Sequence, residues 1–260
     1  MPEADRDLLS EAALRAGKIA KRHFGRGPKT WDKGGGQGPV TEADLEVDAM
    51  LREMLTAARP DYGWLSEESP DDQARHGAKR VFVIDPIDGT RAFLNGESSF
   101  SHSLAIVEEG RPIAAAIYLP MKDRLYAAAL GQGATRDGWP IAPSGRVHLN
   151  GAEVLGATSN FKADRWRDGP LPVTQRFVSS LAFRMALAAE GRFDAMITLR
   201  AAWEWDIAAG ALIVSEAGGH VTDQGGASLR FNNPHPQVNG VLAGTPAVHG
   251  ALLDRLAPTP

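Results

Sequence analysis

The segment Val81-Phe82-Val83-Ile84-Asp85-Pro86-Ile87-Asp88-Gly89-Thr90 is the most informative part of this 260-residue sequence. Its first four residues form a short apolar run, which predicts a strand buried on both faces. The rest begins with Asp-Pro and contains Asp-Gly, two pairs that are typical of turns. Active sites in open sheets lie just beyond the carboxyl ends of strands, so this turn is a candidate site as well as a simple chain reversal.

The turn carries two carboxylates three residues apart, Asp85 and Asp88. Together with an intervening backbone carbonyl, they can converge on a hard cation. A set made only of oxygen ligands selects magnesium, manganese or calcium rather than zinc. The chain has no cysteine, which excludes both a thiolate zinc site and a disulfide framework.

Two further acidic positions show a similar pattern. Glu67-Glu68 comes directly after the apolar pair Trp64-Leu65, at the end of a short strand-like run, although a solvated acidic loop would look the same. Asp206 precedes a helix-like run at residues 207–210, and the alternative there is an ordinary helix N-cap. Both positions are therefore candidates to join the aspartates of the turn.

Thr90 adds a possible phosphate site. A helix that starts after Thr90 would present free N–H groups, which offer a binding place for a phosphate. Two metal ions about 3.5–4 Å apart that bridge the attacking and leaving oxygens would then drive an in-line displacement by water. The residues themselves thus point to metal-assisted hydrolysis of a phosphate ester.

The segments around this site predict helices first and strands afterwards. Apolar residues recur at helical spacing between residues 8 and 24, and the glycine-rich stretch 31–39 predicts a mobile loop. A second helix begins after Thr41, an N-cap candidate with Asp44 three residues on. Three strand-like runs joined by short turns predict an antiparallel meander at residues 103–107, 113–119 and 124–129.

The rest of the chain alternates between strands and helices, which indicates an α/β layer. We expect strands at 154–157, 194–198 and 241–243, and helices at 180–190 and 206–217. Residues 131–151 hold five glycines and two prolines, so the boundary between two halves is expected there. The first half, 1–148, would carry most metal-binding motifs, and the second, 149–260, would complete the site within one compact unit.

The composition is that of a soluble globular protein. Hydrophobic residues make up 43% and charged residues 23%, and the net charge of -4 gives no global basic field for nucleic acid. The N-terminus is acidic where a secretory signal would be basic, and no apolar run approaches the roughly 20 residues of a membrane span. We therefore expect a cytoplasmic protein with no nucleic-acid partner and no membrane segment.

Three segments, in this order, resemble the signature of the inositol monophosphatase superfamily: Glu67-Glu68, residues 85–90, and Trp205-Asp206-Ile207-Ala208-Ala209-Gly210. These proteins are lithium-sensitive, magnesium-dependent phosphatases. The similarity extends through residues 39–44 and 215–219, so it covers nearly the whole chain. It implies an α/β fold, a five-layered αβαβα sandwich of the sugar-phosphatase type. It also implies hydrolysis of a small phosphate monoester, inhibition by lithium and, as is frequent in this family, a homodimer.

The resemblance also assigns metal ligands. Glu67, Asp85 and the carbonyl of Ile87 would hold the first magnesium ion. Asp85, Asp88 and Asp206 would hold the second. Glu67 would help to bind a weaker third ion, and manganese could substitute for magnesium. The implied cofactor is therefore two to three Mg²⁺ ions.

Other residues receive catalytic and substrate-binding roles from the same resemblance. Thr90, with Asp44, would orient and deprotonate the attacking water, and Asp44 would reach the third ion through water. Glu68 would support Thr90 or merely shape the loop. The backbone N–H groups of Gly89 and Thr90 would bind the phosphate, and Asp206 would also contact the substrate.

The identity of the ester depends on fewer residues. Inositol-selective members carry a glutamate shortly after the strand that precedes Trp-Asp, but residues 197–202 contain no carboxylate. Arg91 stands where inositol-type members have a second threonine, and it resembles the branch that removes the 3′-phosphate from 3′(2′),5′-bisphosphate nucleotides. Arg91 can bind a second phosphate bidentately. Lys162, Arg165 and Arg167 would hold the 5′-phosphate, unless they form only a solvated basic loop.

We therefore expect a 3′(2′),5′-bisphosphate nucleotidase, with inositol-1-phosphatase as the close alternative. Histidinol-phosphate and sugar-bisphosphate phosphatases are further alternatives. From another class, a non-catalytic regulatory protein could keep the fold, but it would have no chemical need for the full acidic set. A metal-dependent nuclease is a weaker alternative, because two-metal chemistry also cleaves diesters but a pI near 6.0 lacks the basic footprint.

Overall fold

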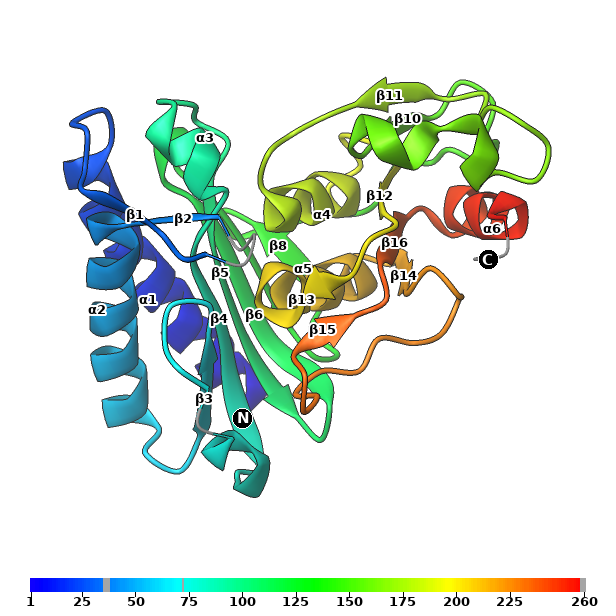
Figure 1. The fold of residues 1–260 in the computed structure, drawn as a ribbon. Helices are drawn as coiled ribbons and strands as arrows, with labels where there is room; N and C mark the ends of the chain where they lie inside the picture. Colours follow the sequence, from blue (N-terminus) through cyan, green and yellow to red (C-terminus); the bar gives the residue numbers. More distant parts are fainter. Residues whose placement is uncertain (35–37, 72, 258–260) are drawn as a thin grey trace.

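The computed structural model describes residues 1–34, 38–71 and 73–257, which Figure 1 shows as stacked layers. The helices α1 (Pro2–His23) and α2 (Glu42–Ala58) form one outer layer against a seven-stranded sheet. The helices α4 (Leu181–Ala189) and α5 (Glu204–Glu216) separate this sheet from a five-stranded one. The helix α6 (Pro246–Arg255) packs on the second sheet as the last layer. The predicted five-layered αβαβα sandwich is confirmed.

The larger sheet has the strand order β3-β4-β5-β6-β7-β8-β9. β3 and β4 run parallel and every other neighbouring pair is antiparallel, so the predicted meander is confirmed. The bounds are β3 (Gly63–Ser66), β4 (Arg80–Asp88), β5 (Ser101–Glu108), β6 (Arg111–Leu119), β7 (Arg124–Ala129), β8 (Ala134–Arg136) and β9 (Trp139–Pro140).

β4 is buried on both faces, because its apolar side chains alternate between two cores. Val81 and Val83 join the core that contains α4 and α5, whereas Phe82 and Ile84 join the core under α1 and α2. The strand is longer than predicted and runs on to Asp88, with an irregular register at its end. The candidate metal-binding segment is therefore the bulged end of a central strand rather than a separate turn.

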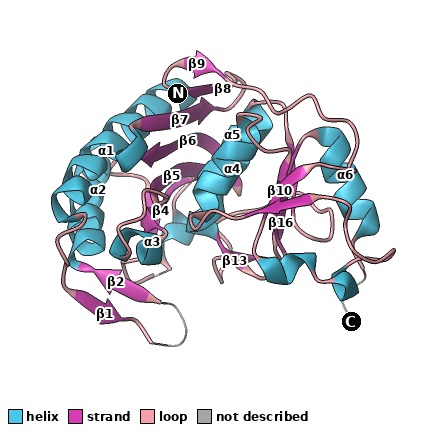
Figure 2. Ribbon diagram, turned by 90° about the horizontal axis from the view of Figure 1, so that it is seen from above, coloured by secondary structure: helices cyan, strands magenta, loops and turns pink. Residues whose placement is uncertain are grey.

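α1 and α2 lie side by side over the larger sheet (Figure 1 and Figure 2). Thr41 caps α2 and Asp44 completes a capping box, as predicted. The Thr41 hydroxyl accepts a hydrogen bond from the Asp44 amide at 3.3 Å, and the Asp44 carboxylate accepts one from the Thr41 amide at 2.8 Å. The buried stripe of α2 that faces the sheet consists of Val47, Leu51 and Leu55.

The smaller sheet has the strand order β11-β10-β12-β16-β14. Its strands are β10 (Glu153–Leu155), β11 (Thr174–Arg176), β12 (Ala195–Thr198), β14 (His220–Thr222) and β16 (Val241–Gly244). β10 pairs in parallel with both β11 and β12, whereas β16 is antiparallel to β12 and β14. The expected α/β character of the second half is confirmed, although β10 ends two residues before the predicted 157.

The prediction of a mobile loop at residues 31–39 is wrong at both ends of that stretch. β1 (Thr30–Asp32) and β2 (Pro39–Thr41) form a two-stranded antiparallel hairpin, in which Trp31 pairs with Val40. Residues 35–37 lie outside the described part of the chain. Strands of three residues are too short for alternation to be recognised beside so many glycines.

Two helix starts differ in a way that matters for the site. α5 begins at Glu204, so Asp206 is its third residue and not an N-cap. α4 begins at Leu181, one residue after the predicted start, because Ser180 is its N-cap and its hydroxyl accepts a hydrogen bond from the Phe183 amide at 2.9 Å. The remaining short elements are α3 (Thr90–Leu94), β13 (Ala202–Trp203), β15 (Gln237–Val238), η1 (Ala74–Gly77), η2 (Pro120–Lys122), η3 (Thr158–Phe161) and η4 (Ala163–Arg165).

Within the described residues, none of the helices combines the length and the apolar character needed to cross a membrane. One buried apolar cluster joins the two sides of the boundary expected near residue 148, with members such as Val83 and Met185. The division into halves 1–148 and 149–260 stays a prediction.

Candidate metal centre

Three carboxylates meet near the end of β4: Glu67 from the turn after β3, Asp85 from β4 and Asp206 from α5. Among the described residues, Glu67, Asp85 and Asp206 each offer an oxygen, and these oxygens lie within 4.8 Å of one another. The parallel pairing of β3 and β4 sets Ser66 opposite Ile84, which carries Glu67 to the level of Asp85. Asp206 arrives from the first turn of α5. The structure therefore brings together three predicted ligands that are far apart in sequence.

Asp85 is the member of this cluster that has a buried oxygen without a hydrogen-bond partner. Its side chain is 1% exposed, and its Oδ1 has no hydrogen-bond partner. Burial, and then the charges of Glu67, Asp88 and Asp206, raise the pKa of Asp85 well above its ordinary value. A buried carboxylate oxygen without a donor is costly unless a cation binds it. An all-oxygen cluster of this kind fits a hard divalent cation.

Asp88 lies on the other side of the bulge, where α4 begins. Its Oδ2 accepts hydrogen bonds from Ser180 Oγ at 2.6 Å and from the Ala182 amide at 2.7 Å. Burial raises the pKa of Asp88 to about 6, although these hydrogen bonds favour the charged form. Asp88 and Asp206 also act on each other, since burial and then the Asp88 charge raise the pKa of Asp206. Asp88 therefore adds negative charge beside the cluster of Glu67, Asp85 and Asp206.

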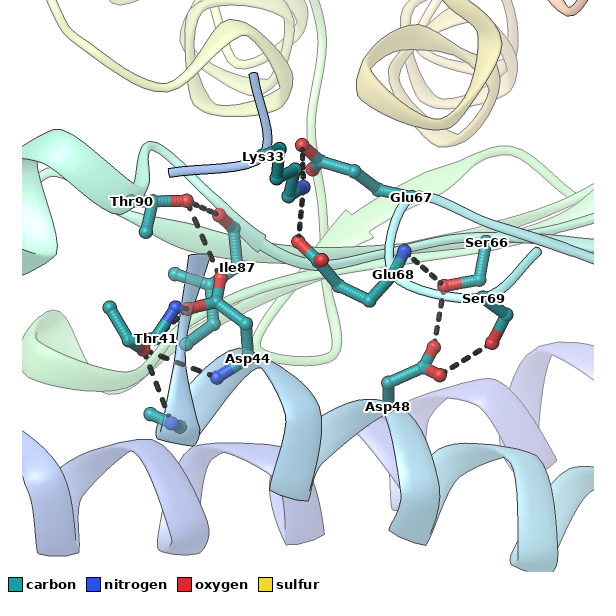
Figure 3. A network of polar contacts seen from close by, with 11 residues as sticks. Lys33, Thr41, Asp44, Asp48, Ser66, Glu67, Glu68, Ser69, Ile87 and Thr90 are labelled. Carbon is teal, nitrogen blue, oxygen red and sulfur yellow. Dashed lines mark hydrogen bonds and ion pairs between the residues drawn. The ribbon is translucent and has the colours of Figure 1, made fainter. Parts of the chain in front are cut away.

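Thr90 and Asp44 are brought together as predicted (Figure 3). Thr90 Oγ1 lies 3.4 Å from Asp44 Oδ1 and 3.2 Å from the carbonyl oxygen of Ile87. The hydroxyl has one proton, so it can donate to only one of these oxygens at a time. Burial raises the pKa of Asp44 to about 6, while its hydrogen bonds from Thr41 oppose the shift. Asp44 is therefore a buried base within reach of a hydroxyl.

Gly89 and Arg91 flank Thr90 on either side. Gly89 has φ of 97°, in the left-handed region that favours glycine, and it precedes α3 as the N-cap. Arg91 is exposed, and its guanidinium approaches the β1–β2 hairpin, since a Cβ built on Gly38 would lie 3.9 Å from Nη2. Lys162 is also exposed and follows η3 directly. The substrate-binding roles of Arg91 and Lys162 stay predictions.

Arg167, which the sequence analysis grouped with Lys162, contacts the end of α6. Its Nε donates to the backbone oxygen of Leu256 at 3.0 Å, and its amide donates to the backbone oxygen of Arg255 at 2.8 Å. Both partners belong to the C-terminal end of α6. Arg167 therefore braces the chain terminus in this structure.

Lys33 is a site residue that the sequence analysis missed. Its Nζ lies 2.8 Å from Glu67 Oε1 and 2.6 Å from Glu68 Oε1, so it bridges two of the acidic candidates (Figure 3). Burial lowers the pKa of Lys33, but the two glutamates outweigh this and raise it. Burial and the charge of Glu67 raise the pKa of Glu68 to about 7, against the effect of Lys33. Lys33 directly follows β1, and this short strand was not predicted because the surrounding glycines obscure its sequence pattern.

Asp48 is a second missed residue, and it shapes the loop that carries the glutamates. Its two carboxylate oxygens accept hydrogen bonds from Ser66 Oγ at 2.5 Å and Ser69 Oγ at 2.6 Å (Figure 3). The Glu68 amide in turn donates to Ser66 Oγ at 3.4 Å. Asp48 lies one helical turn after Asp44 on α2, so the two residues share a face of the helix. This spacing could have identified Asp48 from the sequence.

These buried acids predict an unusual pH dependence for the metal-free protein. Asp44 and Asp88 have pKa values raised to about 6, and Glu68 to about 7, so the folded state keeps protons that the unfolded chain releases above about pH 4. Deprotonation therefore favours unfolding, and the melting temperature in EDTA is expected to fall between about pH 5 and about pH 7.5. Added Mg²⁺ should remove this fall, because metal binding requires ionised carboxylates. A melting temperature that rises over this range in EDTA would contradict the prediction.

Comparisons with known proteins agree with the motifs over the whole chain. A family model described as the inositol monophosphatase family matches residues 2–259. A relative named inositol-1-monophosphatase, from Mesorhizobium japonicum, is 31% identical over 261 residues, covering 95% of this chain and 94% of the relative. A relative named fructose-1,6-bisphosphatase/inositol-1-monophosphatase, from Aquifex aeolicus, is 31% identical over 256 residues, which cover 95% of this chain and 93% of the relative.

A solved structure agrees as well. The structure of an IMPase from Thermotoga maritima superposes with a TM-score of 0.83 at 28% identity, covering 98% of this chain and 96% of the other. The resemblance inferred from the three motifs is therefore confirmed. The roles of single site residues and the identity of the ester stay predictions.

Proposed function

Because the chain belongs to the inositol monophosphatase family, whose members are metal-dependent phosphatases of phosphate monoesters, we propose that it hydrolyses a small phosphate monoester with Mg²⁺ as cofactor. The observation that carries this proposal is the unpartnered, buried Oδ1 of Asp85 within the cluster of Glu67, Asp85 and Asp206. Oxygen ligands of this kind suit Mg²⁺, and Mn²⁺ is the expected substitute.

The proposed ligands form two overlapping sets. Glu67, Asp85 and the Ile87 carbonyl would hold one ion, and Asp85, Asp88 and Asp206 would hold another. When bound, the ions stabilise negative charge that develops on the phosphate oxygens and lower the pKa of water. Ser180 and Ala182 orient the Asp88 carboxylate through the hydrogen bonds described above.

The protein's own residues would handle the proton of the attacking water. Thr90 Oγ1 accepts a hydrogen bond from that water while it donates its own proton to Asp44 Oδ1, 3.4 Å away. With a pKa of about 6, Asp44 is largely ionised near neutral pH and can accept the proton. The backbone N–H groups of Gly89 and Thr90 would bind the phosphate, and Glu68, paired with Lys33, would support the loop beside it.

For the ester, we propose a 3′(2′),5′-bisphosphate nucleotide, which loses its 3′-phosphate. The support is chemical: residues 197–202 offer no carboxylate for a polyol, and a basic residue, Arg91, follows Thr90. The second candidate is inositol 1-phosphate, which is supported by the name of the Mesorhizobium japonicum relative. Sugar bisphosphates and histidinol phosphate complete the set to be tested.

The test is phosphate release from 3′-phosphoadenosine 5′-phosphate, inositol 1-phosphate, fructose 1,6-bisphosphate and histidinol phosphate, with Mg²⁺ or with EDTA. We expect release only with Mg²⁺, inhibition by lithium, and a kcat/KM at least about tenfold higher for the nucleotide than for inositol 1-phosphate, equivalent to about 1.4 kcal/mol. A tenfold preference for inositol 1-phosphate would overturn the proposed ester. Absence of phosphate release from all four esters would overturn the proposed phosphatase activity.

A further inference from the structure

His102, on β5, is a buried polar residue that the proposed reaction does not use. Its side chain is 0% exposed, and its Nδ1 is hydrogen-bonded to the backbone oxygen of Pro86. Because a carbonyl oxygen only accepts hydrogen bonds, Nδ1 carries the proton and donates it. Burial lowers the pKa of His102 to about 4, so the ring is neutral near neutral pH. Its Nε2 then has no hydrogen-bond partner within the described part of the chain.

The surroundings of His102 are apolar. Side chains alternate along β5, so His102 lies on the same face as Leu104 and Ile106, which belong to the core under α1 and α2. The centroid of its ring lies 6.3 Å from that of Tyr118, on the neighbouring strand β6, and 6.5 Å from that of Phe100. An aliphatic side chain would fill this position without leaving a buried nitrogen unpaired. The bond to the carbonyl is therefore what a histidine provides here and a leucine would not.

This hydrogen bond is made at the bulge of β4. Asp85 pairs with Ser103, and Asp88 pairs with Ser101. Two residues of β4 therefore lie opposite a single residue of β5, which is His102. A bulge disrupts the backbone ladder locally, and the proline in this segment has no N–H with which to restore it. The imidazole N–H thus supplies a hydrogen bond at the point where the ladder is interrupted.

The bonded carbonyl lies between two proposed ligands of one ion. Pro86 connects Asp85, whose carboxylate would hold the ion, to Ile87, whose carbonyl oxygen would hold it as well. Because peptide units are planar, the relative placement of these two residues depends on φ and ψ of Pro86. The proline ring fixes φ at about −65°, and a hydrogen bond that fixes the direction of the carbonyl also fixes ψ. His102 therefore removes the remaining backbone freedom at Pro86.

The residues on either side of His102 hold the opposite face of the sheet. Ser101 Oγ lies 2.9 Å from Ser180 Oγ, and Ser103 Oγ donates to the backbone oxygen of Trp205 at 2.8 Å. The Ser180 hydroxyl in turn binds an aspartate of the second proposed ligand set, and Trp205 directly precedes another. Three consecutive residues of β5 thus contact the segments that carry proposed metal ligands.

We propose that His102 is a positioning residue for the metal centre. Through its Nδ1–H it fixes the Pro86 carbonyl, and thereby holds the ligands on either side of Pro86 in the arrangement that binds one divalent cation. This inference rests on the proposed metal-dependent phosphatase function and adds to it a residue that is not itself a ligand. Removal of such supporting partners typically lowers metal affinity or activity by about 10- to 100-fold.

Three substitutions at His102 test this hydrogen bond. His102→Asn places an amide N–H near the position of Nδ1, His102→Gln places it near Nε2, and His102→Leu has no donor. Electron paramagnetic resonance of free Mn²⁺ measures metal affinity without turnover. We expect His102→Leu and His102→Gln to weaken Mn²⁺ binding by about 10- to 100-fold, and His102→Asn to stay within about threefold of the wild type. Unchanged affinity in His102→Leu, or an equal loss in His102→Asn, would overturn the inference.

Two core variants separate positioning from a general loss of packing. Ile106→Ala removes buried volume from the same face of β5, and Tyr118→Phe keeps the ring beside His102 but removes its hydrogen bond to Asp123. Both should leave the Mn²⁺ affinity within about twofold of the wild type. If Ile106→Ala weakens Mn²⁺ binding as much as His102→Leu does, the effect is one of packing and the inference is overturned. Circular dichroism establishes folding, and if His102→Leu is unfolded, the contrast between His102→Asn and His102→Gln decides the test.

Kinetics distinguish this inference from the proposed function. In His102→Leu, the Mg²⁺ concentration for half-maximal phosphate release should rise about 10- to 100-fold, whereas KM for the ester at saturating Mg²⁺ should change by less than about twofold. A raised KM with an unchanged Mg²⁺ requirement would overturn the inference and leave the phosphatase intact. If the wild type binds Mn²⁺ but hydrolyses none of the esters, and His102→Leu still loses Mn²⁺ affinity, the phosphatase is overturned and the positioning role is supported.

The tautomer of His102 can be observed directly. Long-range ¹H–¹⁵N NMR spectra distinguish the two ring nitrogens, and the signals of His102 are those that disappear in His102→Asn. We expect the proton on Nδ1 both with and without Mg²⁺. A neutral ring with its proton on Nε2 would overturn the inference, because an unprotonated Nδ1 cannot donate to a carbonyl oxygen.

Discussion

Asp85→Asn is expected to reduce Mg²⁺-dependent phosphate release by about 1,000-fold. Asp85 belongs to both proposed ligand sets, and its Oδ1 is buried without a hydrogen-bond partner. Lewis-acid stabilisation by bound metal contributes several kcal/mol, and about 1.4 kcal/mol corresponds to a tenfold change in rate. The measurement is the initial rate of phosphate release on the best ester, at saturating Mg²⁺ and across a Mg²⁺ titration.

The same variant has a second expected effect, on stability. Burial and neighbouring acids already favour the protonated form of Asp85 without metal, and asparagine resembles that form. We therefore expect the melting temperature in EDTA to stay level or rise, while the increase caused by Mg²⁺ is lost. Asp61→Asn, at an exposed position, is the matched control and should change neither activity nor the response to Mg²⁺. Wild-type activity in Asp85→Asn would contradict the proposal that Asp85 is a metal ligand.

Arg75→Ala is expected to cost about 3–5 kcal/mol of unfolding free energy, because it breaks a buried charged network. Arg75 is 1% exposed and binds Asp71 through Nε at 3.0 Å and Nη2 at 2.9 Å. It also donates to Asn232 Oδ1 at 2.5 Å and to the backbone oxygen of Asn233 at 2.8 Å. Glu204 holds the same two asparagines through their amides at 2.6 Å and 2.9 Å.

This network joins the segment after Glu67-Glu68 to the start of α5, two residues before Asp206. Its loss should therefore weaken Mg²⁺ binding as well as stability. Urea unfolding measures the stability, and Lys79→Ala is the control, since the Lys79–Glu108 ion pair is 3.1 Å long but Lys79 is 72% exposed. That control should change stability by less than about 0.5 kcal/mol. A similarly small change for Arg75→Ala would show that the network contributes little.

The proposed ligands could be recognised from the sequence because each leaves a local signal. Asp85 and Asp88 follow a run of four apolar residues, and Glu67 follows Trp64-Leu65. Such runs predict strand ends, and strand ends are where sites form. The parallel pairing of β3 and β4 then produced the predicted approach of Glu67 to Asp85. The capping box of Thr41 and Asp44 was predictable for the same reason, since it depends on residues three apart.

Lys33 left no local signal of comparable strength. Lys33 reaches the glutamates because two three-residue strands form a hairpin, and strands so short are not visible as alternation. The sequence instead grouped Arg167 with Lys162, but Arg167 binds the end of α6. Proximity in sequence therefore did not predict that Arg167 contacts the end of α6.

Local sequence preferences were enough to predict the buried strands, the acidic residues at their ends and an oxygen-only set of candidate metal ligands. These features follow from side-chain periodicity and turn preferences, which act over a few residues. The packing of segments far apart in the sequence is what places a cation beside those acids, since Lys33 contacts Glu67 and Glu68. Charged side chains on loops have no periodicity to reveal their partners, so their positions depend on how the two sheets and the helices between them pack.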